Sequence, residues 1–472
     1  MIERPTKCAV SVAVLLCTVG VAPGSGSPTL TASRRSEFRN AEMAAAYVAY
    51  TRSVAGALRT STAIPAFARK YGLRCSACHT VWPELNAFGQ RFKDNGYQLG
   101  NDRDSPIWQA PSYWPIAVRT TPQFHLESTT KQQVDAVPGD PTSGLVEKTI
   151  TQSGFDLSGV DLLMFGTLYQ NITFGFVATL EPPEVGVEAA FVRFDNLGSS
   201  PWANLKVGKF ELDNLLSEKR ITWLSANGGS LFAYHYVPVN GGASFGMGDN
   251  QIGAEFSGHS LNSYSRYSVS LLSTDDGEPG LLGGKSLDAM FTLSQAVATG
   301  GGLGPQRIGV FGYLGHRPTV IQTVNGDPIP GTGSANKSFV RLGATAQVWL
   351  GNLELLPLVS HASDNSALGG GSQNAAWNTA LLEAHYVATA RLMVQGRYEL
   401  VRMSKQSDPA TPKTLGNVDA FAVGFRAYPF MFSRDGMALH GEFAMTKTAG
   451  VAPLSGDAVW GRSVLLAFDF AF

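Results

Sequence analysis

The chain ends in the stretch GRSVLLAFDFAF, from Gly461 to Phe472, in which every second side chain is apolar. Successive side chains of a β-strand point to opposite faces of the sheet. The apolar side chains on one face of this strand are Val464, Leu466, Phe468, Phe470 and Phe472. The opposite face carries the polar residues Ser463 and Asp469 together with apolar ones. The stretch therefore predicts a strand that meets a uniformly apolar environment on one side only.

The same two-residue period recurs through most of the chain. In ITFGFVATLE (172–181), apolar residues occupy every second position, and in RLGATAQVWLG (341–351) they again share one face. Segments of about ten residues with this alternation are typical of transmembrane β-barrels. The chain's ending, an alternating strand closed by an aromatic residue, resembles the C-terminal assembly signal of bacterial outer-membrane barrels.

We predict an all-β protein, a barrel of about sixteen strands. The predicted strands begin near residues 116, 153, 172, 187, 203, 250, 264, 287, 307, 338, 353, 376, 391, 418, 437 and 462. Short and long connections alternate, except at 182–186, and the longest are predicted at 128–150 and 213–249. An even strand number puts both termini in the periplasm and the long loops outside. A soluble β-sandwich is the alternative, but the outward apolar face leaves no second sheet for it to pack against.

The composition and the N-terminus indicate an exported protein that does not bind nucleic acid. The formal net charge of −1 lacks the basic excess that nucleic-acid binding requires. Lys7 and the apolar run CAVSVAVLLCTVGVA after it predict a secretory signal over residues 1–27. Residues 28–60 are a linker of unclear role, or a sign that the chain starts downstream near Met43.

Between the linker and the barrel lies a C-x-x-C-H motif, in the stretch GLRCSACHTVWPELNAFGQRFKDNGYQLG. In such a motif the two thiols, here Cys75 and Cys78, form thioether bonds to haem, and the following histidine, His79, is the proximal iron ligand. A thioredoxin-like dithiol is the alternative, but the β-α-β pattern that it needs is not visible. We predict a monohaem cytochrome c segment over residues 61–112 that plugs the lumen of a barrel formed by residues 113–472.

The residues around the motif predict a helix and an aromatic haem pocket. Pro83 suits the first turn of a helix, and Gly96 suits its C-terminal cap. Leu85, Phe88 and Phe92 would form the apolar face of this helix, at three- and four-residue spacing. Further aromatic residues that could cover a haem are Phe67, Tyr71, Trp82 and Tyr97.

A sixth iron ligand is missing from this segment, because no methionine or second histidine lies between His79 and His125. The first barrel strand, IAVRTTPQFHLE (116–127), turns His125 toward the lumen, where it is a candidate ligand or one more polar lining residue. Met393, on the lumen face of a later strand, is a lesser candidate. Arg119, Arg397 and Glu399 are candidates to pair with haem propionates or to line the lumen.

The haem segment resembles the N-terminal segment of the fused outer-membrane cytochrome–porins, the family that includes the iron oxidases of iron-oxidising bacteria. The resemblance rests on F-A-R before C-x-x-C-H-T, then P-x-L-x-x-F-G-x-x-F-K and G-Y. It implies one covalent haem c, held by Cys75, Cys78 and His79. It also implies electron flow from an extracellular donor, Fe(II) in the iron oxidases, to a soluble cytochrome c or cupredoxin of the periplasm.

The sequence thus predicts a bacterial outer-membrane electron-transfer protein, in contact with outer-membrane lipid and with a possible iron(II):cytochrome c oxidoreductase activity. Two alternatives stay open, an outward conduit to an extracellular acceptor and a porin with a structural or redox-sensing haem plug. No cluster of carboxylates or histidines along the sequence marks an iron site.

Overall fold

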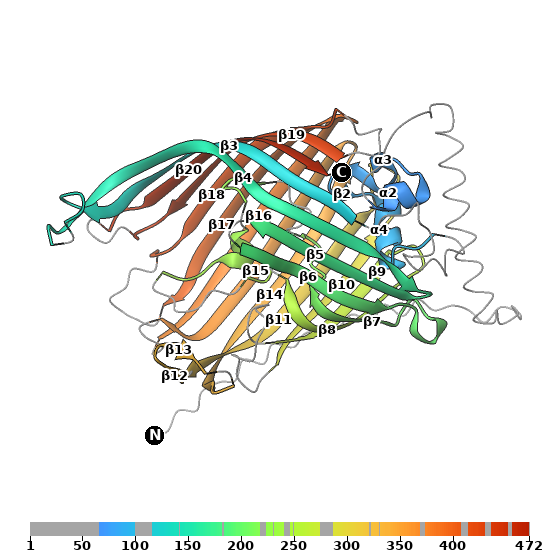
Figure 1. Cartoon of the computed structure of the whole chain (residues 1–472), viewed down its shortest axis with the longest axis horizontal. Helices are drawn as coiled ribbons and strands as arrows, with labels where there is room; N and C mark the ends of the chain where they lie inside the picture. The colour runs from blue at the N-terminus through green and yellow to red at the C-terminus, as the bar shows by residue number, and fades with distance from the viewer. Residues whose placement is uncertain are drawn as a thin grey trace, which may run out of the picture.

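The computed structural model describes residues 66–99, 116–140, 142–181, 184–217, 223–229, 231–239, 246–248, 250–273, 287–320, 322–329, 331–368, 373–406, 414–429, 436–451 and 456–471. In these residues the chain forms a closed β-barrel with a small helical segment at one end (Figure 1). The predicted signal and linker, residues 1–27 and 28–60, lie outside the described residues. Among the described helices, none is long and apolar enough to cross a membrane.

The barrel consists of sixteen antiparallel strands, as predicted, and closes where β20 pairs with β3. The strands are β3 (Ile116–Asp135), β4 (Leu145–Tyr169), β5 (Ile172–Glu181), β6 (Glu184–Phe194), β7 (Asn204–Phe210), β8 (Gln251–His259), β9 (Ser265–Leu272), β10 (Asp288–Val297), β11 (Gln306–Val320), β14 (Ser334–Leu350), β15 (Leu353–Leu368), β16 (Gln373–Thr389), β17 (Leu392–Gln406), β18 (Val418–Ala427), β19 (Gly436–Thr448) and β20 (Val459–Ala471). The hairpin of β12 (Thr323–Val324) and β13 (Asp327–Pro328) lies outside this ring.

The C-terminal strand has the two faces that its sequence predicts. Val464, Leu466 and Phe468 are exposed on the outer face, where each keeps more than 40% of its surface accessible. Ser463 and Asp469 point inward and are buried. An apolar exterior and a polar interior are what a barrel in a bilayer requires.

The predicted connection at 128–150 is partly wrong, because both flanking strands run on into it. β3 continues to Asp135 and β4 begins at Leu145, so the pair forms the long hairpin that projects from the barrel in Figure 1. The sequence there, ESTTKQQVD, is polar on both faces and carries no alternation. A strand that extends beyond the lipid is wet on both sides and so loses the period-two signal.

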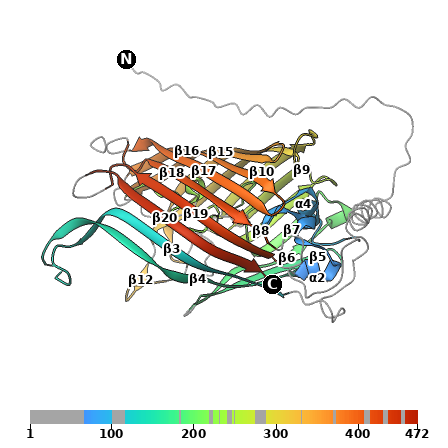
Figure 2. The same cartoon turned by 90° about the horizontal axis from the view of Figure 1, so that it is seen from above.

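Apart from the two-residue connection between Glu181 and Glu184, the short turns lie at one end of the barrel, which we call the short-turn end. They include residues 170–171 between β4 and β5, 351–352 between β14 and β15, and 390–391 between β16 and β17. The helical segment is at this same end, beside the C-terminus (Figures 1 and 2). Its elements are α2 (Ala66–Tyr71), α3 (Cys75–Cys78), β1 (His79–Val81), β2 (Glu84–Leu85) and α4 (Ala87–Asp94). We call residues 66–99 the plug.

The predicted start of the plug helix at Pro83 is wrong, whereas its predicted end is confirmed. Pro83 lies in the turn between β1 and β2, and α4 begins only after Asn86, whose side-chain oxygen accepts a hydrogen bond from the Gly89 amide at 2.9 Å. Asparagine is a favoured N-cap residue because its side-chain oxygen accepts from an amide of the first turn that would otherwise have no partner. At the other end Gly96 has φ +70°, and Tyr97 N–H donates to the Phe92 carbonyl at 2.9 Å, which is a Schellman cap.

The connection between β7 and β8 folds back into the lumen. We call the described residues of this connection up to 248, namely 211–217, 223–229, 231–239 and 246–248, the lumen loop; it contains α5 (Phe232–His235). The Leu224 amide donates to Glu442 Oε2 on β19 at 2.9 Å, and the Ala233 amide donates to Glu399 Oε1 on β17 at 2.5 Å. β17 lies half-way round the ring from β7, so the loop crosses the interior. Arg397, which donates to the Gly228 carbonyl, and Glu399 are lumen residues as predicted, and both hold this loop.

Candidate haem site and an adjoining carboxylate–histidine cluster

The C-x-x-C-H motif folds as one tight turn that directs its reactive groups to one cavity. α3 is a single turn, in which the Ala77 amide donates to the Arg74 carbonyl at 3.0 Å. Cys75, Cys78 and His79 all line a cavity of about 320 Å³. The two cysteines form no disulfide. The structure therefore brings together the three residues that the motif predicts for covalent haem attachment.

The lining of this cavity fits a planar apolar group that carries acidic substituents. Several aromatic rings line it, and those of Phe67 and Tyr97 stack at a centroid distance of 5.0 Å. The other aromatic lining residues are Trp82, Phe92 and Phe165. The charged lining residues are Arg74, Lys93 and Glu211, of which the two cations could pair with propionates.

His79 is oriented as a metal-ligating histidine usually is. Its Nδ1 atom lies 3.1 Å from the Pro83 carbonyl oxygen and 3.2 Å from the Glu84 carbonyl oxygen. A carbonyl oxygen only accepts, so Nδ1 carries the proton and Nε2 holds the lone pair that an iron ion would bind. The backbone of the β1–β2 hairpin thus fixes both the tautomer and the ring orientation.

The thiols do not suit a dithiol that exchanges disulfides. Burial, with a smaller contribution from Cys75, raises the pKa of the Cys78 thiol to about 12. Redox-active thiols of the thioredoxin type have a lowered pKa, because the thiolate is the reacting form. The thioredoxin-like alternative is therefore disfavoured by the surroundings of the motif.

The two candidates for the sixth ligand lie in different places. His125 is on β3, where its Nδ1 atom is 3.2 Å from Glu127 Oε1, and it does not line the cavity. Met393 is fully buried and packs in one cluster with Cys75 and Trp82. Among the described residues that line the cavity there is no methionine and no histidine besides His79. Of the two candidates, the structure brings Met393 to the haem segment and leaves His125 away from it.

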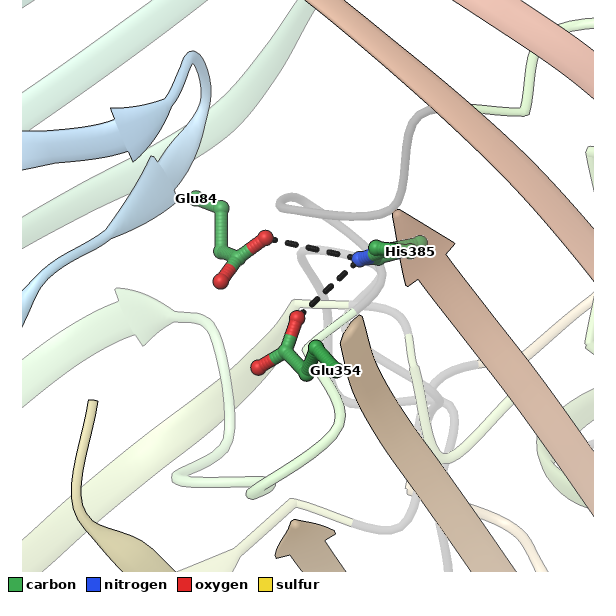
Figure 3. Close-up of side chains that lie close together, drawn as sticks. All are labelled: Glu84, Glu354 and His385. Carbon is green, nitrogen blue, oxygen red and sulfur yellow. Dashed lines mark hydrogen bonds and ion pairs between the residues drawn. The ribbon is translucent and has the colours of Figure 1, made fainter. Parts of the chain in front are cut away.

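A second group of ionisable side chains lies where the plug meets the barrel wall (Figure 3). His385 Nδ1 on β16 lies 3.4 Å from Glu84 Oε2 of the plug and 3.1 Å from Glu354 Oε2 on β15. His385 Nε2 lies 2.6 Å from Glu383 Oε1. Burial, and after it the charge of Glu354, raises the pKa of Glu84 to about 8. We call these four residues the carboxylate–histidine cluster.

The barrel is similar to solved structures of porins. An anion-selective porin from Comamonas acidovorans aligns over 76% of this chain and 99% of its own, with a TM-score of 0.50 and 11% identity. The fold is the porin barrel. The outer membrane channel DcaP of Acinetobacter baumannii covers 75% of this chain and 97% of its own, at TM-score 0.45 and 10% identity. OmpT of Vibrio cholerae covers 75% and 100%, at 0.43 and 9%. No family model and no curated protein matches the chain.

The plug is attached to the porin barrel by buried polar contacts. Arg266 Nε lies 3.1 Å from Asp94 Oδ2, and the Tyr428 hydroxyl donates to the Trp82 carbonyl at 2.8 Å. Arg119, a predicted lumen residue, pairs with Asp469 at 3.0 Å and lies 5.6 Å from the Trp82 ring centroid. These contacts come from strand ends at the short-turn end, so the haem motif is held in that mouth of the barrel.

No cluster of carboxylates or histidines is visible along the sequence, but the fold brings Glu84, Glu354 and His385 together. The cluster was missed because Glu84, Glu354 and the pair Glu383/His385 lie in three separate parts of the sequence. The only local signal is the E-x-H spacing, which puts two ionisable side chains on the lumen face of one strand. Strand pairing and the docking of the plug supply the rest.

Proposed function

We propose that this protein transfers electrons across the bacterial outer membrane, from Fe(II) or another small extracellular reductant to a periplasmic carrier, by way of one covalent haem c. The observation that carries the proposal is the geometry of His79, whose Nδ1 atom is held at 3.1 and 3.2 Å from two backbone carbonyls while both motif thiols line the same apolar cavity. When bound, the haem supplies a one-electron carrier. Cys75, Cys78 and His79 would hold it.

The position of the motif supports a particular orientation of the barrel in the membrane. Short turns face the periplasm in single-chain outer-membrane barrels, which would put the plug and the end of β20 on that side. A periplasmic cytochrome or cupredoxin would then dock near the haem. The outer mouth is distant: β15 runs from Glu354, beside the plug, to Leu368, roughly 45 Å along the strand. An extracellular donor must therefore be small and soluble enough to enter the lumen.

The filling of the lumen favours electron transfer over passive diffusion. The plug occupies the short-turn mouth, and the lumen loop crosses the interior above it. Lys93 of the plug lies 3.9 Å from Glu211 of the loop, so the two are in contact. A general porin needs an open water path. The alternative that the porin fold supports is a porin with a structural or redox-sensing haem plug.

Stopped-flow spectroscopy tests the proposal. The haem-loaded protein, purified in detergent and oxidised, is mixed anaerobically with Fe(II) near neutral and at acidic pH, and the reduced α-band is followed. We expect rapid reduction that His79→Ala abolishes and that His361→Ala, which changes an exposed histidine on β15, leaves intact. A haem that dithionite reduces but Fe(II) does not would exclude Fe(II) as the donor. The measured reduction potential separates inward from outward flow.

A further inference from the structure

The carboxylate–histidine cluster has the composition of a metal site. One ligand atom each from Glu84, Glu354 and His385 lies within 4.8 Å of the other two, close enough for one ion to reach all three. Figure 3 shows the two carboxylates converging on the same ring nitrogen, Nδ1 of His385. One imidazole and two carboxylates suit a divalent first-row ion such as Fe(II) or Mn(II), whereas Cu(I) prefers sulfur.

The contacts of His385 are those of a prepared ligand. Its Nε2 atom lies 2.6 Å from Glu383 Oε1, a carboxylate that can only accept when ionised. Nδ1 faces Glu84 and Glu354, so without an ion it carries a proton as well, and a metal ion that binds there displaces that proton. A carboxylate behind the second ring nitrogen is the usual outer partner of a metal-bound histidine, because it fixes the tautomer and raises the basicity of the ring.

The local charges call for a cation. The Glu354 and Glu383 side chains are fully buried, and those of His385 and Glu84 are 4% and 13% exposed. Among the described residues, Glu84 has no hydrogen bond of ordinary geometry, and its closest cationic contact is His385 Nδ1 at 3.4 Å. Arg397 also acts on Glu383, but it donates to the Gly228 carbonyl. With all three carboxylates ionised, a protonated His385 and Arg397 together still leave one net negative charge at the cluster.

The site has room for water and a direct connection to the haem motif. All four members of the cluster line a cavity of about 100 Å³, more than the roughly 10–15 Å³ that one water molecule needs, so waters could complete the coordination of an ion. Glu84 belongs to both sites, because its carboxylate faces His385 while its carbonyl accepts from His79 Nδ1 at 3.2 Å.

We propose that Glu84, Glu354 and His385 bind a divalent first-row metal ion at the junction of plug and barrel, with Glu383 as the outer partner of the histidine. In the setting of the proposed function, on which this part of the inference rests, the ion is the donor Fe(II). Loss of one electron converts it to Fe(III), and the oxidised haem c takes up that electron. The competing possibility is that a protonated His385 alone neutralises the carboxylates and no metal binds.

The test is metal binding by the full haem-loaded chain. Mn(II), which does not reduce the haem, is titrated into the protein in detergent, and the free ion is followed by electron paramagnetic resonance. We expect one tight site, weakened about tenfold or more in Glu84→Gln and in Glu354→Gln. Glu127→Gln, which changes a lumen carboxylate on β3 away from the cluster, is the matched control and binds as the wild type does.

Glu84 belongs to the plug and Glu354 to the barrel wall, so the test stays decisive if one of the two variants misfolds. Glu84→Gln keeps the backbone carbonyl that orients His79, so the haem spectrum reports an intact plug, and Glu354→Gln leaves the plug unchanged. Absence of a tight Mn(II) site in the wild type, or unchanged affinity in both variants, overturns the inference. If Fe(II) nevertheless reduces the haem in Glu354→Gln at the wild-type rate, the proposed function stands without this site. If Mn(II) binds but Fe(II) does not reduce the haem, the site stands and Fe(II) fails as donor.

Discussion

Gly89 allows α4 to lie directly on the C-x-x-C turn. A Cβ atom on this residue would lie 2.1 Å from the Cys78 carbonyl oxygen and 3.0 Å from Leu85 Cδ2, so Gly89→Ala must push the helix away. Overpacking of this kind costs about 1–3 kcal/mol. We expect Gly89→Ala to lower the amount of covalently attached haem, measured as haem absorbance per protein. Gly301→Ala is the control, because a Cβ there meets no atom within 4 Å, and an equal loss in both variants would contradict the argument.

Asp94 makes the docking of the plug sensitive to acid. Burial favours its neutral form, but the charges of Arg266 and then His259 outweigh burial and hold the pKa of Asp94 below its ordinary value. A lowered pKa gives a stabilisation that is complete above about pH 4 and is lost as the pH falls through the folded-state value. The protection of the α4 amides from hydrogen exchange, relative to the intrinsic exchange rate at each pH, should therefore be constant near neutrality and fall in acid.

The matched variant for this prediction is Asp94→Asn. It should weaken docking by roughly 1.5–3 kcal/mol at neutral pH and remove most of the acid dependence. Asp364→Asn, which removes a carboxylate paired with Arg341 on the barrel wall, is the control and should leave exchange in α4 unchanged. An acid response that persists in full in Asp94→Asn would mean that another group controls docking.

At the scale of elements, the sequence predicts features that consecutive residues encode and misses those that tertiary contacts create. The strands and the haem motif were predictable, because alternation in stretches such as Val464 to Phe468 and the C-x-x-C-H spacing are written in consecutive residues. The extension of β3 and β4 was not, because both faces of that hairpin are wet. The carboxylate–histidine cluster needs the register of β15 with β16 and the docking of Glu84, and neither follows from one sequence.

The lumen loop should restrict ion flow through the barrel. Glu442 holds it by accepting from the Leu224 and Ser225 amides, at 2.9 and 3.3 Å. Glu442→Ala leaves those buried donors without this acceptor, at a cost of about 1–3 kcal/mol, and should release the loop. We expect a higher single-channel conductance in planar bilayers than for wild type. Glu127→Ala, on the lumen face of β3, is the control, and unchanged conductance in Glu442→Ala would show that the loop does not limit the pore.

For the whole molecule, the arrangement of plug, loop and barrel determines which donors can react. The haem motif lies in the short-turn mouth, and the lumen loop lies between it and the other end of the barrel. If the short turns face the periplasm, an extracellular solid cannot touch the haem edge, whereas a hydrated ion can enter the lumen. In the proposed function, direction and donor size are therefore linked, because the geometry that would bring a haem near a periplasmic carrier would restrict the outside donor to small solutes.

This link gives a prediction for intact cells. In a host that displays the haem-loaded protein in its outer membrane, dissolved Fe(II) should reduce the haem, whereas Fe(II) fixed to chelating beads too large for the lumen should not. Reduced α-band absorbance in the cell suspension is the measurement, and dithionite gives the full amplitude. Equal reduction by the beads would mean that the haem lies at the outer surface, because only then could a donor that stays outside the barrel reach it.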